Sequence, residues 1–457
     1  MRTETNKRYI LIVLLFFHTV NTYMDRIAIS AASGLIQTDL GITSQMMGYV
    51  FGIFALGYAL FQIPSGMLAD HYGPRKALSW IVAAWSFFTA LTGAAWNAVS
   101  LLVMRFFFGV GEAGAFPGAA TAVYNWIPAR ERGMANGIFH SGARVGAAMS
   151  LFLMPFLIRL VGWRATFLIN GLLGIVWLLF WLYWFRDKPR EKKNVSESEI
   201  NYIEEGLVRK QNESKTKLPL AQILTSSNML LIMFQYIASN ITFFISFTWL
   251  LPYLISQWGE GAEIFAPIPL LCGMFAQWIS GWLSTMIYSA GFPVNSRKIP
   301  AITGFLISVI GLVLLVTVGV STPLGFTLLF SIAVFGVEMT ISPSWSVCMD
   351  IGKEKSGTIS ATMNMLGNLG SAFSAVIFPF FVDRVTIPLL ATSTGTANSF
   401  FVFAATINLL AALAWVFISP SKKLKIKSPQ QLRMRYISFL LFIFIATTAL
   451  ILYRFLI

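Results

Sequence analysis

The chain has 457 residues, of which 56% are hydrophobic and 11% are charged, and its mean hydropathy is +0.70. Soluble domains are about 45–50% apolar and about 25% charged, so this composition excludes a water-soluble fold. The net charge of +14 does not indicate nucleic-acid binding, because the basic residues cluster between apolar runs, as they do in cytoplasmic loops. Both cysteines lie inside apolar runs and indicate neither a disulfide framework nor a metal site.

Twelve apolar runs are long enough to cross a bilayer, and they fall into two groups of six. The N-terminal run is predicted to span the membrane rather than to be a cleaved signal peptide. We therefore expect an all-α polytopic membrane protein with two six-helix bundles around a central cavity, at residues 1–185 and 219–420. In chain order the predicted spans are 9–29, 46–68, 77–97, 99–124, 135–158, 165–185, 226–255, 263–288, 299–319, 322–349, 358–382 and 397–418.

Two segments lie outside the bundles. Residues 186–218 form the longest polar stretch and are predicted to be a cytoplasmic linker, with a surface helix that begins at the capping-box pair Ser196 and Glu199. Residues 421–457 comprise a basic tail and a thirteenth hydrophobic segment, 436–453, which is predicted to cross the bilayer.

The basic residues predict the orientation of the chain. They concentrate at the N-terminus, in alternate loops, in the linker and in the tail, which places the N-terminus and the linker in the cytoplasm. No predicted outer loop carries an Asn-x-Ser/Thr glycosylation signal. This pattern favours a bacterial inner membrane.

Six charged residues fall inside predicted spans, where each costs about 2.5–3.5 kcal/mol to insert and is a functional candidate. Arginine suits a carboxylate because its planar fork donates two charge-assisted hydrogen bonds, whereas buried acids suit proton transfer. The equal number of acids and arginines suggests that a proton and an anion move together. The six are Asp25, Arg26, Arg105, Glu112, Arg144 and Glu338.

Structural roles for the same residues remain open. Arg105 and Glu112, two turns apart on one helix face, are also consistent with an ion pair that holds helices together. Arg144 is equally consistent with pairing to Glu338, and Asn364 with helix packing. The glycines of the fourth span, which include Gly109 and Gly114, are expected to allow close helix approach.

Several motifs resemble known transporters. The stretch from Gly66 to Lys76 after the second span resembles the loop signature of the major facilitator superfamily. Three further stretches, at 23–26, 105–117 and 344–357, resemble its anion:cation symporter family, which includes bacterial sugar-acid permeases and sialin-type organic anion transporters.

This resemblance implies proton-driven uptake of an organic anion, and it assigns roles to residues by motif position. Arg26 is expected to meet the substrate carboxylate, while Glu112 and Asp25 carry protons; the charge inside a predicted span adds Glu338 as a further proton candidate. The remaining substrate-binding candidates are Tyr23, Tyr58, Arg105, Arg144, Trp345 and Asn364. Asp70, Arg75 and Arg132 at the cytoplasmic loops are expected to form a gating latch.

Two departures from the family pattern carry consequences. Thr285 replaces an acid in the second copy of the loop signature, which predicts a degenerate latch in the C-terminal half. Arg144 follows the place where related permeases hold a glutamine for substrate hydroxyls, so a polyol substrate is less favoured.

The sequence thus predicts a proton-coupled symporter that imports a sugar acid or another small carboxylate by alternating access, as a monomer in the bilayer. It predicts no cofactor beyond the coupling proton, no metal, no nucleic-acid partner and no enzymatic activity. Two alternatives remain open at this stage, a proton-driven exporter of the same superfamily and a transporter-like substrate sensor.

Overall fold

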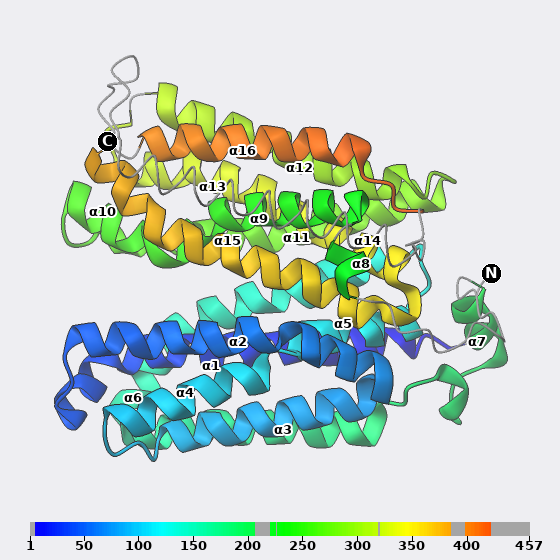
Figure 1. The fold of residues 1–457 in the computed structure, drawn as a ribbon, viewed down its shortest axis with the longest axis horizontal. Coiled ribbons are helices and arrows are strands. Elements are labelled where there is room, and N and C mark those ends of the chain that lie inside the picture. Colours follow the sequence, from blue (N-terminus) through cyan, green and yellow to red (C-terminus); the bar gives the residue numbers. More distant parts are fainter. Residues whose placement is uncertain (1–4, 206–219, 225, 319, 385–397, 422–457) are drawn as a thin grey trace.

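The computed structural model describes residues 5–205, 220–224, 226–318, 320–384 and 398–421. Two helical halves lie side by side along the length of the molecule, one built from the first half of the chain and the other from the second (Figure 1). Nine helices in the described part of the chain are long and apolar enough to cross a membrane. The all-α prediction is confirmed. The predicted thirteenth segment, 436–453, lies outside the described residues.

The N-terminal half contains six helices, of which the last joins two predicted spans. Its long helix α6 has a non-helical residue, Gly162 (φ 80°, ψ 163°), where the chain passes from the fifth predicted span to the sixth. Glycine suits this position because a positive φ disfavours residues with a Cβ. The helices are α1 (Arg8–Leu40), α2 (Ser44–Tyr72), α3 (Pro74–Thr92), α4 (Ala98–Glu112), α5 (Ala115–Trp126) and α6 (Arg132–Trp184).

The linker and the C-terminal half follow. The linker contains the 3-10 turn η1 (Pro189–Glu191) and the helix α7 (Glu197–Glu204), and the C-terminal half also has two 3-10 turns, η2 (Ala262–Phe265) and η3 (Lys353–Lys355). The other helices are α8 (Leu220–Leu224), α9 (Ser227–Thr248), α10 (Leu250–Trp258), α11 (Ile268–Ser289), α12 (Asn295–Thr317), α13 (Pro323–Met339), α14 (Ile341–Gly352), α15 (Ser356–Arg384) and α16 (Asn398–Phe417).

Three predicted spans are each divided into two helices. The fourth span breaks between α4 and α5, the seventh between α9 and α10, and the tenth between α13 and α14. A proline follows each break within a few residues, at Pro117, Pro252 and Pro343. Proline lacks the N–H group and its ring clashes with the carbonyl four residues earlier, so the helical hydrogen bonds are interrupted just before it.

Glycines of the fourth span allow close helix packing, as predicted. A Cβ added at Gly109 would lie 2.3 Å from the carbonyl oxygen of Phe54 on α2. One added at Gly111 would lie 2.9 Å from the backbone nitrogen of Trp85 on α3. Helix α4 therefore contacts the backbones of both neighbours, which places its C-terminal end inside the bundle.

The linker helix α7 docks on the N-terminal half, at the end of the molecule where the N-terminus lies (Figure 1). Ser196 accepts a hydrogen bond from the Glu199 N–H group (3.3 Å), which confirms the predicted N-cap. The Glu199 carboxylate instead accepts the backbone N–H groups of Lys7 and Arg8 at the start of α1 (3.0 and 3.1 Å). Glu199 thus caps a second helix that has no cap of its own.

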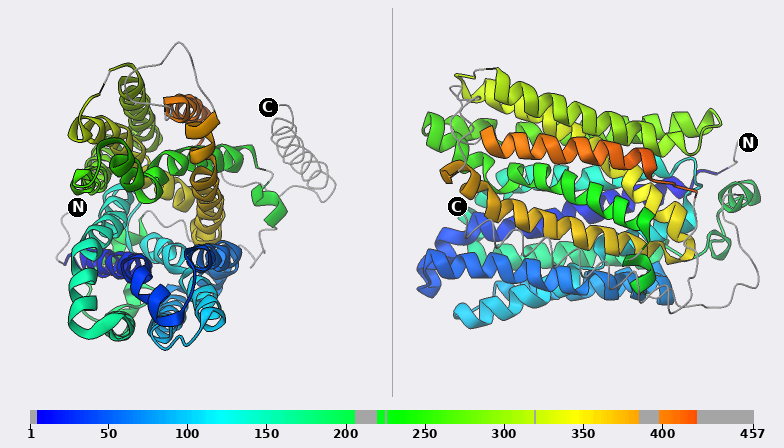
Figure 2. Two further views of the ribbon diagram at one scale, coloured as in Figure 1. Left: turned by 90° about the vertical axis from the view of Figure 1, so that its left-hand side faces the viewer. Right: turned by 45° about the horizontal axis from the view of Figure 1, so that its top comes forward.

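The two halves contact each other mainly through α2 against α15 and α6 against α11. The end-on view shows the halves as two adjoining groups of helices (Figure 2). Both contacts run from the middle of the molecule to the end that carries the linker, called the linker end below. Residues contributed by both halves therefore enclose the middle of the molecule.

Candidate substrate and proton site

Arg26 and Glu112 form an ion pair in the middle of the N-terminal half. The Arg26 Nε atom lies 2.6 Å from Glu112 Oε1, and the Glu112 side chain is 1% exposed against 17% for Arg26. Glu112 reaches Arg26 because α4 ends at this glutamate, ahead of the Pro117 break. In the described part of the chain, Arg26 Nη2 and Glu112 Oε2 have no hydrogen-bond partner.

Three aromatic rings surround the Arg26 guanidinium. Its carbon lies 5.0 Å from the ring centre of Tyr23, 5.4 Å from that of Phe54 and 4.5 Å from that of Tyr58. Cation–π contacts at these distances hold a guanidinium in place, and a side-chain hydrogen bond with Tyr58 adds to them. The geometry leaves the Arg26 donor Nη2 available to an anion.

Asp25 and Arg105 complete the charged group of the N-terminal half. Both side chains are buried, at 1% and 2% exposure, and Asp25 interacts electrostatically with Glu112 and with Arg105. The Arg105 guanidinium carbon lies 4.5 Å from the Phe108 ring centre, and its Nε has no hydrogen-bond partner among the described residues. An ion pair between Arg105 and Glu112 is one interpretation of the sequence. In the structure Glu112 pairs with Arg26 instead.

A second buried ion pair joins the two halves. Arg144 on α6 donates two hydrogen bonds to Glu338 on α13, from Nε to Oε2 (3.0 Å) and from Nη2 to Oε1 (2.6 Å). Gln277 on α11 also donates to Glu338 Oε2 (2.5 Å). Of the two roles that the sequence suggests for Arg144, substrate binding and pairing with Glu338, this conformation shows the pairing.

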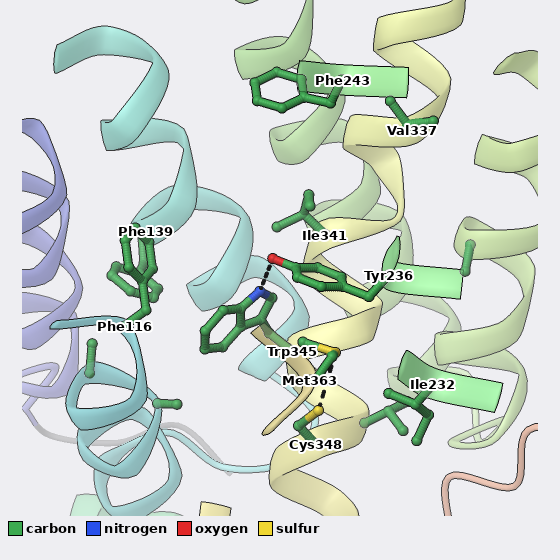
Figure 3. Packing of buried hydrophobic residues seen from close by; sticks show 14 of the residues in the cluster. Phe116, Phe139, Ile232, Tyr236, Phe243, Val337, Ile341, Trp345, Cys348 and Met363 are labelled. Carbon is green, nitrogen blue, oxygen red and sulfur yellow. Dashed lines mark hydrogen bonds between the residues drawn. The ribbon is translucent and has the colours of Figure 1, made fainter. Parts of the chain in front are cut away.

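Aromatic residues from the two halves face each other, with Phe116 and Phe139 on one side and Trp345 and Tyr236 on the other (Figure 3). Trp345, which is fully buried, donates its Nε1–H to the Tyr236 hydroxyl (3.1 Å) and lies 5.9 Å from the Phe116 ring. Asn364 on α15 donates to the Tyr58 hydroxyl across the interface between the halves (3.3 Å). Tyr58 in turn lies against the Arg26 guanidinium, so Asn364 is connected to the charged group through this tyrosine.

Asp70 connects the halves at the linker end. Its carboxylate accepts hydrogen bonds from the backbone N–H groups of Gly357 and Thr358 (2.9 and 2.8 Å) and from the Thr358 hydroxyl (2.5 Å). These donors form the N-terminal turn of α15, where a carboxylate is stabilised by unpaired N–H groups and the helix dipole. The α2 residue therefore caps a helix of the opposite half.

Arg132 also crosses to the C-terminal half, whereas Arg75 binds within its own half. Arg132 and Arg297 bind the two oxygens of Asp350, at 2.9 and 3.0 Å. The backbone N–H of Arg75 donates to Asp187 (2.8 Å), and its Nη2 donates to a carbonyl of α6. Two of the three predicted latch residues thus bridge the halves in this conformation.

The second copy of the loop signature still bridges the halves although Thr285 replaces the acid. The Met134 N–H group donates to Thr285 Oγ1 (3.2 Å). A neutral hydroxyl makes a weaker contact than a carboxylate. The contact is therefore reduced, in keeping with the predicted degeneracy.

Sequence reasoning missed several partners of these residues. Gln277 binds Glu338, and Asp350 binds both Arg132 and Arg297, yet none of Gln277, Asp350 and Arg297 was selected as a site residue. One available signal was the spacing from Glu112 to Pro117, which recurs from Glu338 to Pro343. The repeat marks both glutamates as residues that precede a proline break.

Comparison with known proteins identifies the family. Residues 14–375, well over half of the chain, match the family model described as Major Facilitator Superfamily. The chain is 30% identical over 445 residues to the probable sulfoacetate transporter SauU of Cupriavidus necator, covering 94% of this chain and 98% of that protein. It is 31% identical over 448 residues to the probable galactarate/D-glucarate transporter GudP of Escherichia coli, covering 93% and 96%.

The fold agrees with a solved structure of the same superfamily. The proton:xylose symporter XylE superposes with a TM-score of 0.68 at 16% identity, over 90% of this chain and 96% of that one. At this identity the likeness concerns the fold. Together with the family match over most of the chain, it shows that the chain is a multi-pass membrane transporter of the Major Facilitator Superfamily.

Proposed function

We propose that the protein imports an organic anion, a sugar acid or another small carboxylate, together with protons, across a bacterial inner membrane. The observation that carries the proposal is the Arg26–Glu112 pair, in which a partly accessible arginine binds a fully buried acid (2.6 Å). The names of the relatives, which are transporters of sulfoacetate and of sugar diacids, support an organic anion as the substrate. The chain functions as a monomer with its N-terminus in the cytoplasm.

Competition for Arg26 couples the two ions. A substrate carboxylate that binds the Arg26 fork takes the place of Glu112, because one guanidinium edge accommodates one carboxylate at a time. Glu112, buried and deprived of its partner, then favours the protonated state, since desolvation penalises the charged form. Protonation of Glu112 and anion binding at Arg26 thus favour each other, which is the reciprocity that symport requires.

The other charged groups adjust this balance. Asp25 interacts electrostatically with both Glu112 and Arg105, so it serves as the second proton site. Arg105 offers a further positive charge and keeps the site attractive to an anion after Glu112 has been neutralised. Tyr23 and Tyr58 hold Arg26 in place and offer hydroxyl groups to the substrate.

Alternating access follows from contacts between the halves. Asp70 and Arg132, which bind across the interface at the linker end, are proposed to hold that end closed while the substrate enters from the opposite side. Rocking of one half against the other would separate these contacts and open the site toward the linker.

The test uses purified protein in proteoliposomes and the variant Glu112→Gln, which imitates permanent protonation. Counterflow exchange of labelled substrate should persist, whereas accumulation driven by an acid-outside gradient should disappear. The matched control is Asp39→Asn, which alters a carboxylate that is 47% exposed at the opposite end and should leave accumulation intact. Accumulation by Glu112→Gln, or substrate movement without proton flux in the wild type, would refute the coupling.

A further inference from the structure

The two halves repeat one charged feature. Glu112 and Glu338 each precede a proline by five residues, and each lies at the C-terminal end of a helix that is interrupted there. Both are almost fully buried, at 0% and 1% exposure. They occupy the fourth span of each half, so they are equivalent positions of the two bundles.

Each glutamate binds an arginine, and both arginines come from the N-terminal half. Glu112 binds Arg26 within its own half, whereas Glu338 binds Arg144 across the interface. Tyr23 contacts both arginines, since its ring centre is 5.0 Å from the Arg26 guanidinium carbon and 5.9 Å from that of Arg144. The guanidinium carbons of Arg26 and Arg144 are therefore no farther apart than the sum of these two distances. A small molecule can span that separation.

Besides Arg144, Glu338 has further contacts within its own half. Gly273 leaves room for its side chain, since a Cβ there would lie 2.9 Å from Glu338 Cγ. Gln277 donates to the same carboxylate and stays beside it when Arg144 moves. Arg144 also contacts the Phe243 ring of the C-terminal half, at 3.8 Å from its centre.

The position of the Arg144–Glu338 pair matters for transport. A rigid-body movement of the halves stretches a contact that joins them, and breaking a buried pair leaves two uncompensated charges. An anionic group on the substrate would compensate Arg144 while Glu338 keeps the hydrogen bond from Gln277. The chain thus has two sites at which a substrate anion can replace a protein carboxylate.

We propose that Arg144 is a second anion-binding position besides Arg26. The substrate then carries two acid groups, and the distance between them is no greater than the distance between the two guanidinium groups. This inference rests on the proposed organic-anion transport and narrows its substrate class to short dicarboxylates and sulfocarboxylates. Arg26 binds one acid group and Arg144 binds the other, both near Tyr23.

The test compares acids that differ by one acid group, with binding to the purified full chain measured by calorimetry. Suitable pairs are galactarate with galactonate, succinate with butyrate, and sulfoacetate with acetate. In any pair that binds, we expect the two-acid member to bind at least about tenfold more tightly to the wild type. The double variant Arg144→Gln/Glu338→Gln removes both charges of the buried pair, so that neither is left without its partner. It should lose this preference for two acid groups while still binding the one-acid member.

The outcomes separate the two proposals. Equal binding of both members by the wild type, or a preference that persists in the double variant, overturns the second anion position and leaves organic-anion transport intact. Failure of the folded wild type to bind any of the six acids overturns both. Arg26→Gln serves as the reference variant, because it should weaken both members of a pair.

Discussion

Arg26 combines three properties that a substrate-binding cation needs in a membrane. It is held by aromatic rings, it binds an acid that can be neutralised, and its Nη2 atom has no hydrogen-bond partner within the described residues. Lysine would supply the charge but not the planar fork. The role of Arg26 therefore depends on its geometry as well as on its charge.

The variant Arg26→Lys tests that geometry. Uptake of the transported acid should fall at least about tenfold, equivalent to about 1.4 kcal/mol of lost stabilisation, because a bidentate contact becomes a single one. Initial rates in proteoliposomes measure the effect. The control is Arg164→Lys, at an arginine that is 44% exposed and pairs with Asp39. Near-normal uptake by Arg26→Lys would contradict bidentate binding.

The sequence identified the buried charges but not all of their partners. Cost of insertion alone singles out Arg26, Arg105 and Glu112, because unpaired charges in a span are rare. Helical spacing placed Arg105 and Glu112 on one face, which suggested an ion pair. The pairing of Glu112 with Arg26 depends on where α4 ends and on how α1 packs beside it, and neither is a property of local spacing.

At the level of helices, packing and interruption determine where the charged residues lie. Proline interrupts the fourth and tenth spans next to Glu112 and Glu338, while glycines let α4 approach α2 and α3. The sequence predicted the spans and the close approach. It did not predict the breaks, because proline is tolerated in membrane helices and a hydropathy pattern continues through it.

Replacing Gly109 with alanine tests the close approach of α4 to α2. The added Cβ would lie 2.3 Å from a backbone oxygen of Phe54, so the helices must separate, at a cost of about 1–3 kcal/mol. The melting temperature of the purified protein should fall. Gly52→Ala on α2 is the matched control, since a Cβ there meets nothing within 4 Å. Equal melting temperatures would contradict this packing.

The docking of α7 gives a second prediction for a single helix. Glu199 is fully buried and binds Arg8, whose side chain is 5% exposed, at 3.0 Å. Glu199→Gln removes one of the two carboxylates that pair with Arg8 and leaves the Glu131 pair, so it should cost up to about 3–5 kcal/mol, the range for breaking a buried pair. Limited proteolysis of the linker should accelerate several-fold. Glu197→Gln, at a side chain that is 76% exposed, should change nothing; equal cleavage rates for the two variants would contradict the docking.

For the whole molecule, the sequence predicted two helical halves but not the contacts between them. Composition, run lengths and the polar linker were sufficient for two six-helix units. The contacts between the units join residues far apart in the sequence, such as Asn136 with Ser346 (3.1 Å), which are 210 positions apart. Such pairs follow from the conformation of the whole chain, and no motif in either half specifies them.

Asp350 bridges the two halves at the linker end. Its two oxygens bind Arg132, which is 3% exposed, and Arg297, which is fully buried. Asp350→Asn removes the charge that both arginines share, so closure at this end becomes less stable and the population shifts toward a conformation open to the linker side.

A cysteine at Ser346, buried between the halves in this conformation, reports the change in a background where Cys272 and Cys348 are replaced by serine. A polar maleimide should label it several-fold faster in Asp350→Asn than without that change. A cysteine at Ser86, buried within the N-terminal half, should be labelled at the same slow rate in both. Equal rates at Ser346→Cys would show that Asp350 does not hold the linker end closed.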